Sequence, residues 1–228
     1  MYKNLTFLGI IPARKNSKRL KNKNVKNLNG KPLIYHTIES ARKSKYLDSF
    51  LLSTDSAYVG QLAKRFKCEV PFIRPRYLSS DNSSTAMVVY HALKKIKTNY
   101  DYVILLQPTS PLRRAEDIDK AIIKIVNLKA ISLISVYCSK KLKKFPTKIV
   151  NNLIKKTKRK YNNNNNYFLN GAIYICKTKF FLENKTFYSN KTIPFIMPKN
   201  RSVDIDTFEE FNEAEKICKK TNRTFTFN

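Results

Sequence analysis

Short apolar runs alternate with segments of helical periodicity along most of this chain. The first run ends at Ile11 before Pro12, a second spans Ser49–Ser53, and the strongest strand signal lies at Tyr100–Leu106. A continuous apolar run is typical of a strand buried on both faces, as in a parallel sheet. Strands that alternate with helices favour a mostly parallel sheet covered by helices on both sides. The sequence therefore predicts an α/β fold with a Rossmann-like, mostly parallel sheet flanked by helices.

The remaining elements follow from hydrophobic periodicity and from residues that start or stop helices. Pro32 is expected at the first position of a helix whose apolar positions run from Leu33 to Ala41. Further strands are expected at Glu69–Ile73, Ala130–Tyr137, Tyr167–Ile175 and Ile193–Met197, with a two-stranded segment at Lys148–Ile154. Further helices are expected at Ala57–Phe66, Ala86–Ile96, Glu116–Leu128, Lys179–Glu183 and Phe208–Lys220.

One domain accounts for most of the chain, because 228 residues suffice for one substantial core with a small appendage. The stretch 138–168 breaks the alternation: it is rich in lysine, contains Phe145-Pro146 and includes the asparagine run Asn162–Asn166. We therefore expect a single α/β domain formed by residues 1–137 and 169–228, from which residues 138–168 make an excursion.

Composition excludes several classes of protein. The sequence has no run of about 18 apolar residues, which excludes a membrane span, and the first residues show no cleavable signal pattern. The four cysteines are far apart and form no C-x-x-C pair, which argues against a zinc site or a disulfide framework. These features favour a cytoplasmic protein with buried, reduced thiols.

The formal net charge of +29 needs an explanation. Clustered Lys and Arg side chains bind nucleic-acid phosphates, so a basic nucleic-acid-binding protein is one hypothesis. The lysines are, however, spread over nearly the whole chain and accompany many asparagines. A general bias toward Lys and Asn explains the charge more simply, and no specific nucleic-acid partner is expected.

A cationic loop within Gly9–Asn24, G-I-I-P-A-R-K-N-S-K-R-L-K-N-K-N, follows the first strand. Pro12 removes a backbone donor and ends that strand. Open α/β folds hold phosphates at the carboxyl ends of their strands, so the loop is a candidate phosphate site. A solvated basic loop is the alternative. The cations of the loop are Arg14, Lys15, Lys18, Arg19, Lys21 and Lys23.

Carboxylates and a turn at later positions complete the candidate site. The segment Asp204-Ile205-Asp206 stands out in a chain with 16 acidic residues. In an extended backbone both carboxylates point the same way and can share one Mg²⁺, which favours a few carboxylates with phosphate oxygens. A cap for the last helix is the alternative. The turn Gln107–Arg114 follows one strand, and Asp55 follows another, where it is either a site residue or part of a helix cap.

Six ordered sequence blocks span almost the entire chain. They are I-I-P-A-R-x-x-S-K-R at Ile10–Arg19 with Lys23-Asn24, G-K-P-L-I at Gly30–Ile34, S-T-D at Ser53–Asp55, L-L-Q-P-T-S-P-L-R at Leu105–Arg113, N-G-A-I-Y-I at Asn170–Ile175 and R-S-V-D-I-D-T at Arg201–Thr207. Each block alone is modest evidence, but the ordered set is specific. It resembles the acylneuraminate cytidylyltransferase (CMP-sialic acid synthetase) family, which includes legionaminic and pseudaminic acid cytidylyltransferases.

The resemblance implies a reaction, a fold and a set of site residues. In this family CTP and a nine-carbon 2-keto sugar acid give a CMP-sugar and pyrophosphate, on a fold of the nucleotide-diphospho-sugar transferase type. By the resemblance, Arg14, Lys23 and Asp206 would be catalytic, and Asp204 and Asp206 would bind Mg²⁺. The nucleotide would be held by Arg14, Ser17, Lys18, Lys23, Asn24, Arg74, Ser84 and Thr85, with Gln107 facing the sugar.

The excursion at 138–168 would be a dimerisation arm by the same resemblance. In a homodimer it would reach the partner's site, where Lys143 and Arg159 would meet the sugar carboxylate; surface charges are the alternative. The chain departs from the family pattern at Lys15-Asn16, where glycines are common, and after Arg159. Sialic, legionaminic and pseudaminic acids are not separated. Activation of the eight-carbon acid Kdo, or of a neutral sugar, is the alternative within the fold.

Overall fold

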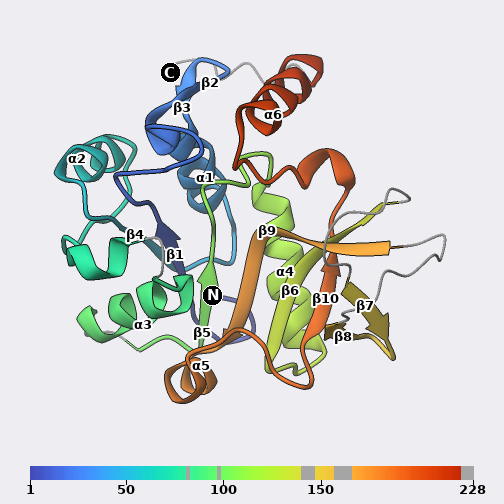
Figure 1. Ribbon diagram of the computed structural model, residues 1–228. Coiled ribbons are helices and arrows are strands. Elements are labelled where there is room, and N and C mark those ends of the chain that lie inside the picture. The colour runs from blue at the N-terminus through green and yellow to red at the C-terminus, as the bar shows by residue number, and fades with distance from the viewer. Residues whose placement is uncertain (81–82, 97–98, 140–146, 157–165, 222–228) are drawn as a thin grey trace.

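A mostly parallel sheet forms the centre of the computed structural model, which describes residues 1–80, 83–96, 99–139, 147–156 and 166–221 (Figure 1). Its central strands lie in the order β10 (Ile193–Ile196), β6 (Ser132–Ser139), β9 (Asn166–Lys177), β5 (Tyr102–Leu105), β1 (Phe7–Pro12) and β4 (Ser49–Ser53). Neighbours in this order are parallel, except that β9 is antiparallel to both β5 and β6. The predicted α/β class is confirmed.

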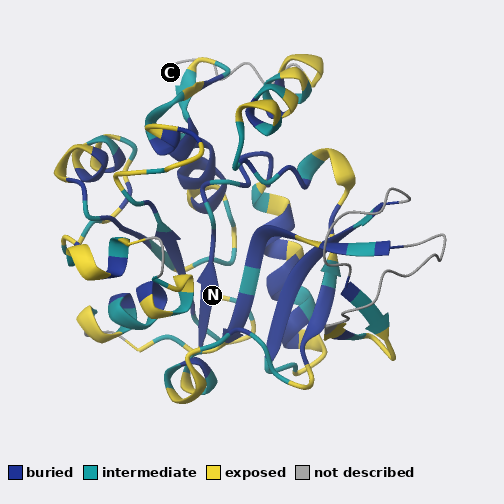
Figure 2. Cartoon of the chain, viewed as in Figure 1, coloured by how far each residue is buried: buried dark blue, intermediate teal, exposed yellow. Residues whose placement is uncertain are grey.

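Helices cover both faces of the sheet (Figure 1). One face carries α1 (Leu33–Arg42), α2 (Ala57–Arg65) and α4 (Ala115–Asn127), and the other carries α3 (Thr85–Lys95) and α5 (Thr178–Asn184). Side chains of β1 alternate between the two layers, with Phe7 and Ile11 in the first and Leu8 and Ile10 in the second. Both sets are buried, as the dark central strands of Figure 2 show. No helix in the described residues combines the length and the apolar character that crossing a membrane requires.

A third apolar cluster lies beyond the carboxyl-terminal edge of the sheet. Its main element is α6 (Phe208–Lys220), which buries Phe211 and Ala214 against Leu112 and Ile205. The helical periodicity of this segment is thereby confirmed. Because α6 packs here, it holds the residues that precede it against the end of the sheet.

Three local predictions are wrong. Glu69–Ile73 is not a strand, because only isolated bridges join its ends to the edge of the sheet, one at β4 and one just after β4. Pro32 does not lie in the helix but precedes α1 as its N-cap, in the short strand β3 (Lys31–Pro32), which pairs with β2 (Asn27–Leu28). Of the four thiols, Cys138 is half-buried rather than buried.

The described part of the 138–168 segment includes a hairpin beside the sheet. Strands β7 (Thr147–Val150) and β8 (Leu153–Lys156) pair in antiparallel fashion, which agrees with the two-stranded prediction. The connecting residues Asn151 and Asn152 both have positive φ, as a two-residue type I′ turn requires. The hairpin meets the main sheet through a bridge from β7 to β9.

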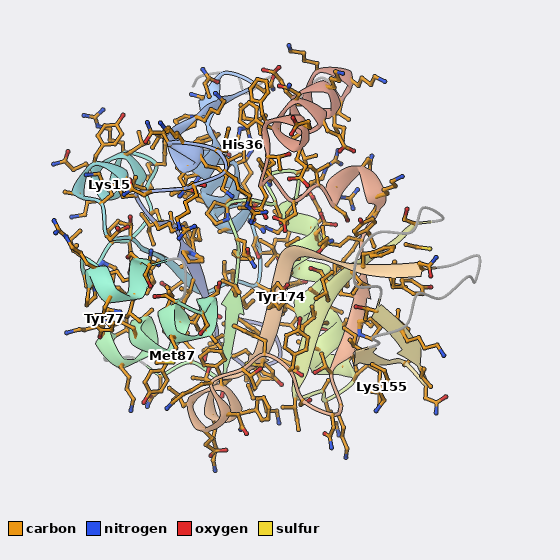
Figure 3. The ribbon with its side chains drawn as sticks, in the orientation of Figure 1. Lys15, His36, Tyr77, Met87, Lys155 and Tyr174 are labelled. Atoms are coloured by element: carbon orange, nitrogen blue, oxygen red, sulfur yellow. The ribbon has the colours of Figure 1, made fainter. Side chains whose placement is uncertain are left out.

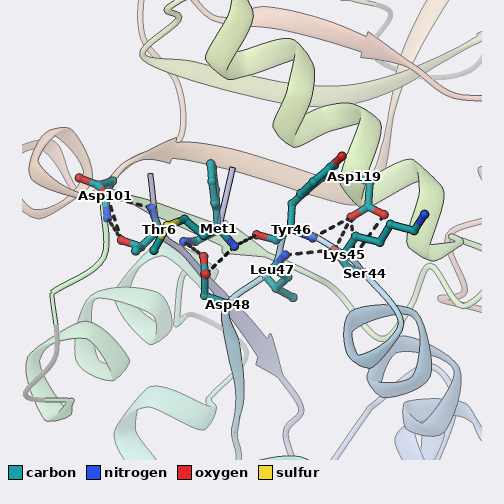
Figure 4. A network of polar contacts seen from close by, with 10 residues as sticks. Met1, Thr6, Ser44, Lys45, Tyr46, Leu47, Asp48, Asp101 and Asp119 are labelled. Carbon is teal, nitrogen blue, oxygen red and sulfur yellow. Dashed lines mark hydrogen bonds and ion pairs between the residues drawn. The ribbon is translucent and has the colours of Figure 1, made fainter. Parts of the chain in front are cut away.

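Acidic side chains tie loops together at the amino-terminal edge of the sheet (Figure 4). Asp119 accepts hydrogen bonds from the Ser44 hydroxyl and from the backbone N–H groups of Lys45 and Tyr46. Asp101 accepts the backbone N–H and the hydroxyl of Thr6. Part of the chain's small complement of carboxylates therefore has structural partners at the edge away from the predicted site.

Candidate active site

A pocket of about 280 Å³ opens at the carboxyl-terminal ends of β1 and β5. The residues that line it come from segments far apart in the sequence, which meet because the carboxyl ends of parallel strands share one edge of the sheet. The lining includes seven residues that the sequence predicts for the site: Arg14, Lys23, Asn24, Arg74, Thr85, Gln107 and Asp206. Other polar lining residues are Ser80, Ser83 and Thr109.

Hydrogen bonds to its backbone hold the cationic loop in place. Asp55 Oδ1 accepts the N–H of Lys15 at 2.7 Å. Asn24 lies in η1 (Lys23–Val25) and donates from Nδ2 to the carbonyl oxygen of Arg14 at 2.9 Å. The Lys15 side chain itself is exposed and lies beside α2 (Figure 3). The loop is therefore anchored on both sides of the Arg14 peptide.

Two residues of this loop stand where glycines are common in the family that the sequence resembles. Neither Lys15 nor Asn16 has a positive φ. Glycine's access to left-handed conformations is therefore not needed at these positions. Only the backbone N–H of Lys15 is used for anchoring, and any residue other than proline supplies it.

Arg74 is almost fully buried at the side of the pocket, with 3% of its side chain exposed. Its Nε donates to Ser79 Oγ at 3.0 Å, and its Nη2 lies 3.8 Å from Asp55 Oδ1. Burial lowers the pKa of the Arg74 guanidinium, while the charge of Asp55 opposes this effect. Ser56 caps α2, so Asp55 is not the cap. Asp55 instead links Arg74 to the cationic loop.

Lys23 connects the cationic loop to the carboxylates near the other end of the chain. Its buried Nζ donates to the carbonyl oxygen of Ile205 at 2.8 Å and to Asp206 Oδ1 at 2.9 Å. Arg19 Nη2 lies 2.8 Å from Asp206 Oδ2. Each oxygen of Asp206 therefore faces a loop cation. Sequence reasoning did not select Arg19 for the site, because nothing in the sequence separates it from the other cations of its loop.

Asp204 lies beside Asp206 but is set back from the pocket. The Thr109 hydroxyl favours the ionised form of the Asp204 carboxyl and partly offsets the rise of its pKa, whereas its Oδ1 is buried and has no hydrogen-bond partner among the described residues. Burial raises the pKa of the Asp204 carboxyl, and the negative charge of Asp206 adds to this effect. A buried carboxylate oxygen without a partner is costly unless a cation binds it.

The two carboxylates suit a magnesium ion. Mg²⁺ is usually bound by one or two carboxylates and completes its coordination with water and substrate phosphates. The partnerless oxygen of Asp204 could supply one ligand, and Asp206 borders the pocket that phosphates would enter. Among the described residues, no group of three or more His, Cys, Asp or Glu side chains could hold a metal by itself. Water molecules or phosphate oxygens of a substrate would therefore have to complete the coordination of the ion.

Several predicted site residues lie outside the pocket lining. Ser84 caps α3 by accepting a backbone N–H of its first turn at 3.3 Å. Ser17 is half-buried and Lys18 is exposed, and neither lines the pocket. Lys143 and Arg159 lie outside the described residues, so their predicted role in sugar binding stays a prediction.

Arg113 supports the turn that carries Gln107. It is 1% exposed, and its Nη1 donates to the carbonyl oxygens of Ala172 at 2.6 Å and Gln107 at 3.4 Å. Burial lowers the pKa of the guanidinium. Arg113 therefore fixes the turn from within the protein, while the Gln107 side chain lines the pocket.

Comparison with known proteins agrees with the sequence blocks. A cytidylyltransferase family model matches residues 8–227. The chain belongs to the cytidylyltransferase family. It is 36% identical over 93% of its length to CMP-N,N'-diacetyllegionaminic acid synthase of Legionella pneumophila, of which it covers 96%. It is 30% identical over 96% of its length to pseudaminic acid cytidylyltransferase of Campylobacter jejuni, of which it covers 99%. It is 35% identical over 95% of its length to N-acylneuraminate cytidylyltransferase of Escherichia coli, of which it covers 53%.

Solved structures share the fold of this cytidylyltransferase. A structure of CMP:2-keto-3-deoxy-manno-octonic acid synthetase complexed with CTP aligns with a TM-score of 0.75 and 17% identity, over 95% of this chain and 99% of that one. 4-Diphosphocytidyl-2C-methyl-D-erythritol synthase from Anaerococcus prevotii aligns with a TM-score of 0.64 and 12% identity, over 94% and 96% of the two chains. At these identities the likeness concerns the fold.

Proposed function

We propose that this cytidylyltransferase transfers CMP from CTP to a nine-carbon 2-keto sugar acid and releases pyrophosphate. The observation that carries the proposal is the single pocket lined by Arg14, Lys23 and Asp206, with Asp204 directly behind it. The relatives that cover nearly the same length are named for legionaminic and pseudaminic acids, which favours a nine-carbon acid.

The pocket cations suit a bound triphosphate. Arg14, Lys23 and Arg74 line the pocket, and charge-assisted hydrogen bonds from such groups to phosphate are strong. Transfer of a phosphoryl-type group depends mainly on positioning and on charge stabilisation. In the proposed reaction Arg14 and Lys23 hold the triphosphate so that the anomeric hydroxyl attacks the α-phosphorus in line with the leaving pyrophosphate.

Residues at the edges of the pocket would orient the rest of the nucleotide and the sugar. Thr85 and Arg74 would border the cytosine, Asn24 would keep the loop in shape through its bond to Arg14, and Gln107 would face the sugar. Ser17 and Lys18 are proposed for nucleotide binding on the resemblance of their sequence block, and Ser84 on the resemblance of the whole chain to the family.

Asp204 and Asp206 would hold Mg²⁺ together with phosphate oxygens of CTP. Bound there, the ion would neutralise phosphate charge and lower the pKa of a coordinated hydroxyl. Lys23 contacts Asp206 directly and therefore lies where the triphosphate and the carboxylates would meet.

The 138–168 segment would serve as a dimerisation arm. In this proposal the protein is a homodimer, and Lys143 and Arg159 of the arm bind the sugar carboxylate in the partner's pocket. Arg is suited to bidentate binding of a carboxylate. Light scattering on the purified protein should give the mass of a dimer, whereas a monomer mass would contradict this part of the proposal.

Pyrophosphate release is the direct test of the proposed function. Each of the four nucleoside triphosphates is incubated with Mg²⁺ and a panel of sialic, legionaminic and pseudaminic acids and Kdo. We expect turnover with CTP and a nine-carbon acid, and its loss in Asp206→Ala but not in Glu209→Gln, which changes an exposed carboxylate of α6. No turnover with CTP and any of these acids would contradict the proposal.

The same experiment separates the alternatives. Turnover with Kdo alone would favour the eight-carbon acid, whose synthetase shares the fold. A basic nucleic-acid-binding protein would instead bind RNA tightly, and this binding would persist in Asp206→Ala. RNA anisotropy measured on the wild type and on this variant distinguishes that function from the enzyme.

A further inference from the structure

An ion pair joins the segment before the two carboxylates to the first turn of α4. Arg201, the last residue of η3 (Lys199–Arg201), donates from Nε to Asp117 Oδ2 at 2.9 Å and from Nη2 to Asp117 Oδ1 at 2.7 Å. Asp117 is buried, and its Oδ2 also accepts the N–H of Arg114, the N-cap of α4. A bidentate pair fixes the orientation of both side chains as well as their separation. The pair therefore sets where the segment 201–207, here called the carboxylate strap, leaves η3.

Further hydrogen bonds leave the carboxylate strap little freedom between its ends. Asn170 Nδ2 donates to Ser202 Oγ at 3.0 Å, next to Arg201. The N–H of Ile205 donates to the carbonyl oxygen of Thr109 at 2.7 Å. The far end is held by the capped start of α6. These anchors determine the position of Asp204. The ion pair between Arg201 and Asp117 is the charged anchor, at the end of the strap that adjoins η3.

The position of Asp204 tolerates little movement. A Cβ on Gly171 would lie 3.0 Å from Asp204 Oδ2, so not even a methyl group fits between β9 and the carboxylate without a shift. Its other oxygen has no partner among the described residues. Mg²⁺ demands near-octahedral geometry with ligands at about 2.0–2.1 Å. A shift of the strap toward β9 would press Asp204 against Gly171, and a shift away from β9 would change the separation of Asp204 from Asp206.

We propose that Asp117 and Arg201 are positioning residues for the magnesium site. Their ion pair holds the carboxylate strap so that Asp204 and Asp206 can share one cation. This inference rests on the proposed function, in which these two carboxylates bind Mg²⁺. Neither residue lines the pocket, so both act through the strap rather than on the substrate.

The decisive substitution is Arg201→Lys, because lysine keeps the charge beside Asp117 but cannot form the bidentate contact. Asp117→Asn is the second variant, because its amide oxygen can still accept the N–H of Arg114 while the charge is lost. The matched control is Arg42→Lys, since Arg42 contacts both oxygens of Glu39 on α1 in the same manner. All variants are checked by circular dichroism and thermal melting before binding is measured.

The readout is the binding of Mn²⁺ in the absence of nucleotide and sugar. It is monitored through the decrease of the free Mn²⁺ signal in electron paramagnetic resonance. Outer partners of metal ligands typically affect affinity by about 10–100-fold. We expect Arg201→Lys and Asp117→Asn to weaken Mn²⁺ binding at least about tenfold, the lower limit of that range, and Arg42→Lys to leave it unchanged. CTP affinity measured calorimetrically in EDTA should stay within about twofold, because the pocket cations are not altered.

Asp204→Asn provides a test that a purely structural role would not meet. If Arg201 acts through Asp204, adding Arg201→Lys to Asp204→Asn causes no further loss of Mn²⁺ affinity. A wild-type titration equal to that of Asp204→Asn, an unchanged titration in Arg201→Lys, or a further loss in the double variant would each overturn the inference. The pyrophosphate assay on the wild type judges the proposed function separately, since the Mn²⁺ titration contains neither CTP nor a sugar acid.

Discussion

Asp204 is a carboxylate whose surroundings oppose its charge. Burial raises its pKa, and repulsion from Asp206 adds to the effect. Between the ordinary Asp pKa of about 3.9 and this raised value, the folded protein keeps a proton that the unfolded chain has lost. Stability therefore falls as the pH rises through that window. Above that window the carboxylate is ionised in the folded protein as well, and its charge lowers the stability of the metal-free protein.

Asp204→Asn should therefore stabilise the metal-free protein and abolish its activity. We expect the melting temperature in EDTA to rise by a few degrees at neutral pH, and the gain to vanish toward the acidic end of the folded range, where Asp204 is protonated. Calorimetric melts over a pH series measure this. A gain that is independent of pH would contradict the electrostatic explanation.

Asp206→Asn is the matched control for that experiment. Both oxygens of Asp206 face cations, Lys23 at 2.9 Å and Arg19 at 2.8 Å, so its charge has partners in the metal-free protein. We expect Asp206→Asn to lose activity without a gain in melting temperature. Stabilisation of equal size in both variants would show that burial of Asp204 is not the cause.

The two cations on Asp206 should differ in their effect on catalysis. Lys23 is buried, lines the pocket and is held by two acceptors, whereas Arg19 is 67% exposed and its ion pair is screened by solvent. Removal of a preorganised group that stabilises developing charge typically costs about 10²–10³ in rate. We expect Lys23→Met to lower kcat/KM for CTP by about a hundredfold or more, and Arg19→Met by less than about tenfold. Steady-state pyrophosphate release measures both; equal losses would contradict this ranking.

Among single residues, sequence reasoning identified the side chains that face the pocket better than those that hold them in place. The sequence pattern pointed to the cationic loop and to the pair Asp204 and Asp206, and the resemblance to the family then singled out Arg14 and Lys23 within the loop. For Asp55 the sequence left open a site role or a helix cap. In the structure its carboxylate contacts Arg74 and the N–H of Lys15, which lie on two loops that meet only in the folded protein. Ser84, which the resemblance assigns to nucleotide binding, caps α3, and its role toward the nucleotide stays a prediction.

At the scale of elements, two separate constraints require a glycine at position 171 within β9. Gly171 has φ of +69°, which other residues adopt at a cost of about 1–2 kcal/mol. A side chain there would also press on Asp204. We expect Gly171→Ala to lower both the melting temperature and Mg²⁺-dependent pyrophosphate release.

Gly30 is the control for this prediction, because it has φ of +84° in the turn between β2 and β3 and a Cβ there would have nothing within 4 Å. Gly30→Ala therefore introduces backbone strain without contact to the site. Its melting temperature should fall while its kcat stays near the wild-type value. A comparable loss of kcat in both variants would mean that strain alone, rather than pressure on Asp204, explains the effect.

The elements predicted well are those with strong periodicity and a clear start. Strand β4 and helix α6 match their predicted bounds of Ser49–Ser53 and Phe208–Lys220. The failure at Glu69–Ile73 has a tertiary cause: this segment joins the edge of the sheet through two isolated bridges only, one to Leu51 of β4 and one to Thr54 just after it. The anchors of the carboxylate strap were missed, because Asp117 and Arg201 are 84 residues apart and carry no shared pattern.

At the scale of the whole molecule, the net charge of +29 acts on every anion that approaches. Salt screens such long-range attraction, with a Debye length of about 10 Å at 0.1 M. The effect on association grows with the charge of the ligand. CTP carries several negative charges at neutral pH, whereas a sugar acid carries one carboxylate. The sequence gives the size of this charge, but the structure is needed to show that cations line the pocket itself.

The two substrates should therefore respond differently to salt. We expect the KM for CTP to rise several-fold between about 50 and 300 mM KCl, as screening weakens the attraction, and the KM for the sugar acid to rise less. The turnover number at saturating substrates should change little, because the buried contacts of Lys23 are poorly screened. Substitution of Lys64, Lys94 and Lys120 by Gln, exposed lysines outside the pocket lining, should reduce the salt dependence for CTP without altering kcat. Equal salt dependence for both substrates would show that the surface charge does not steer CTP. The net charge would then reflect only the general bias of the sequence toward lysine.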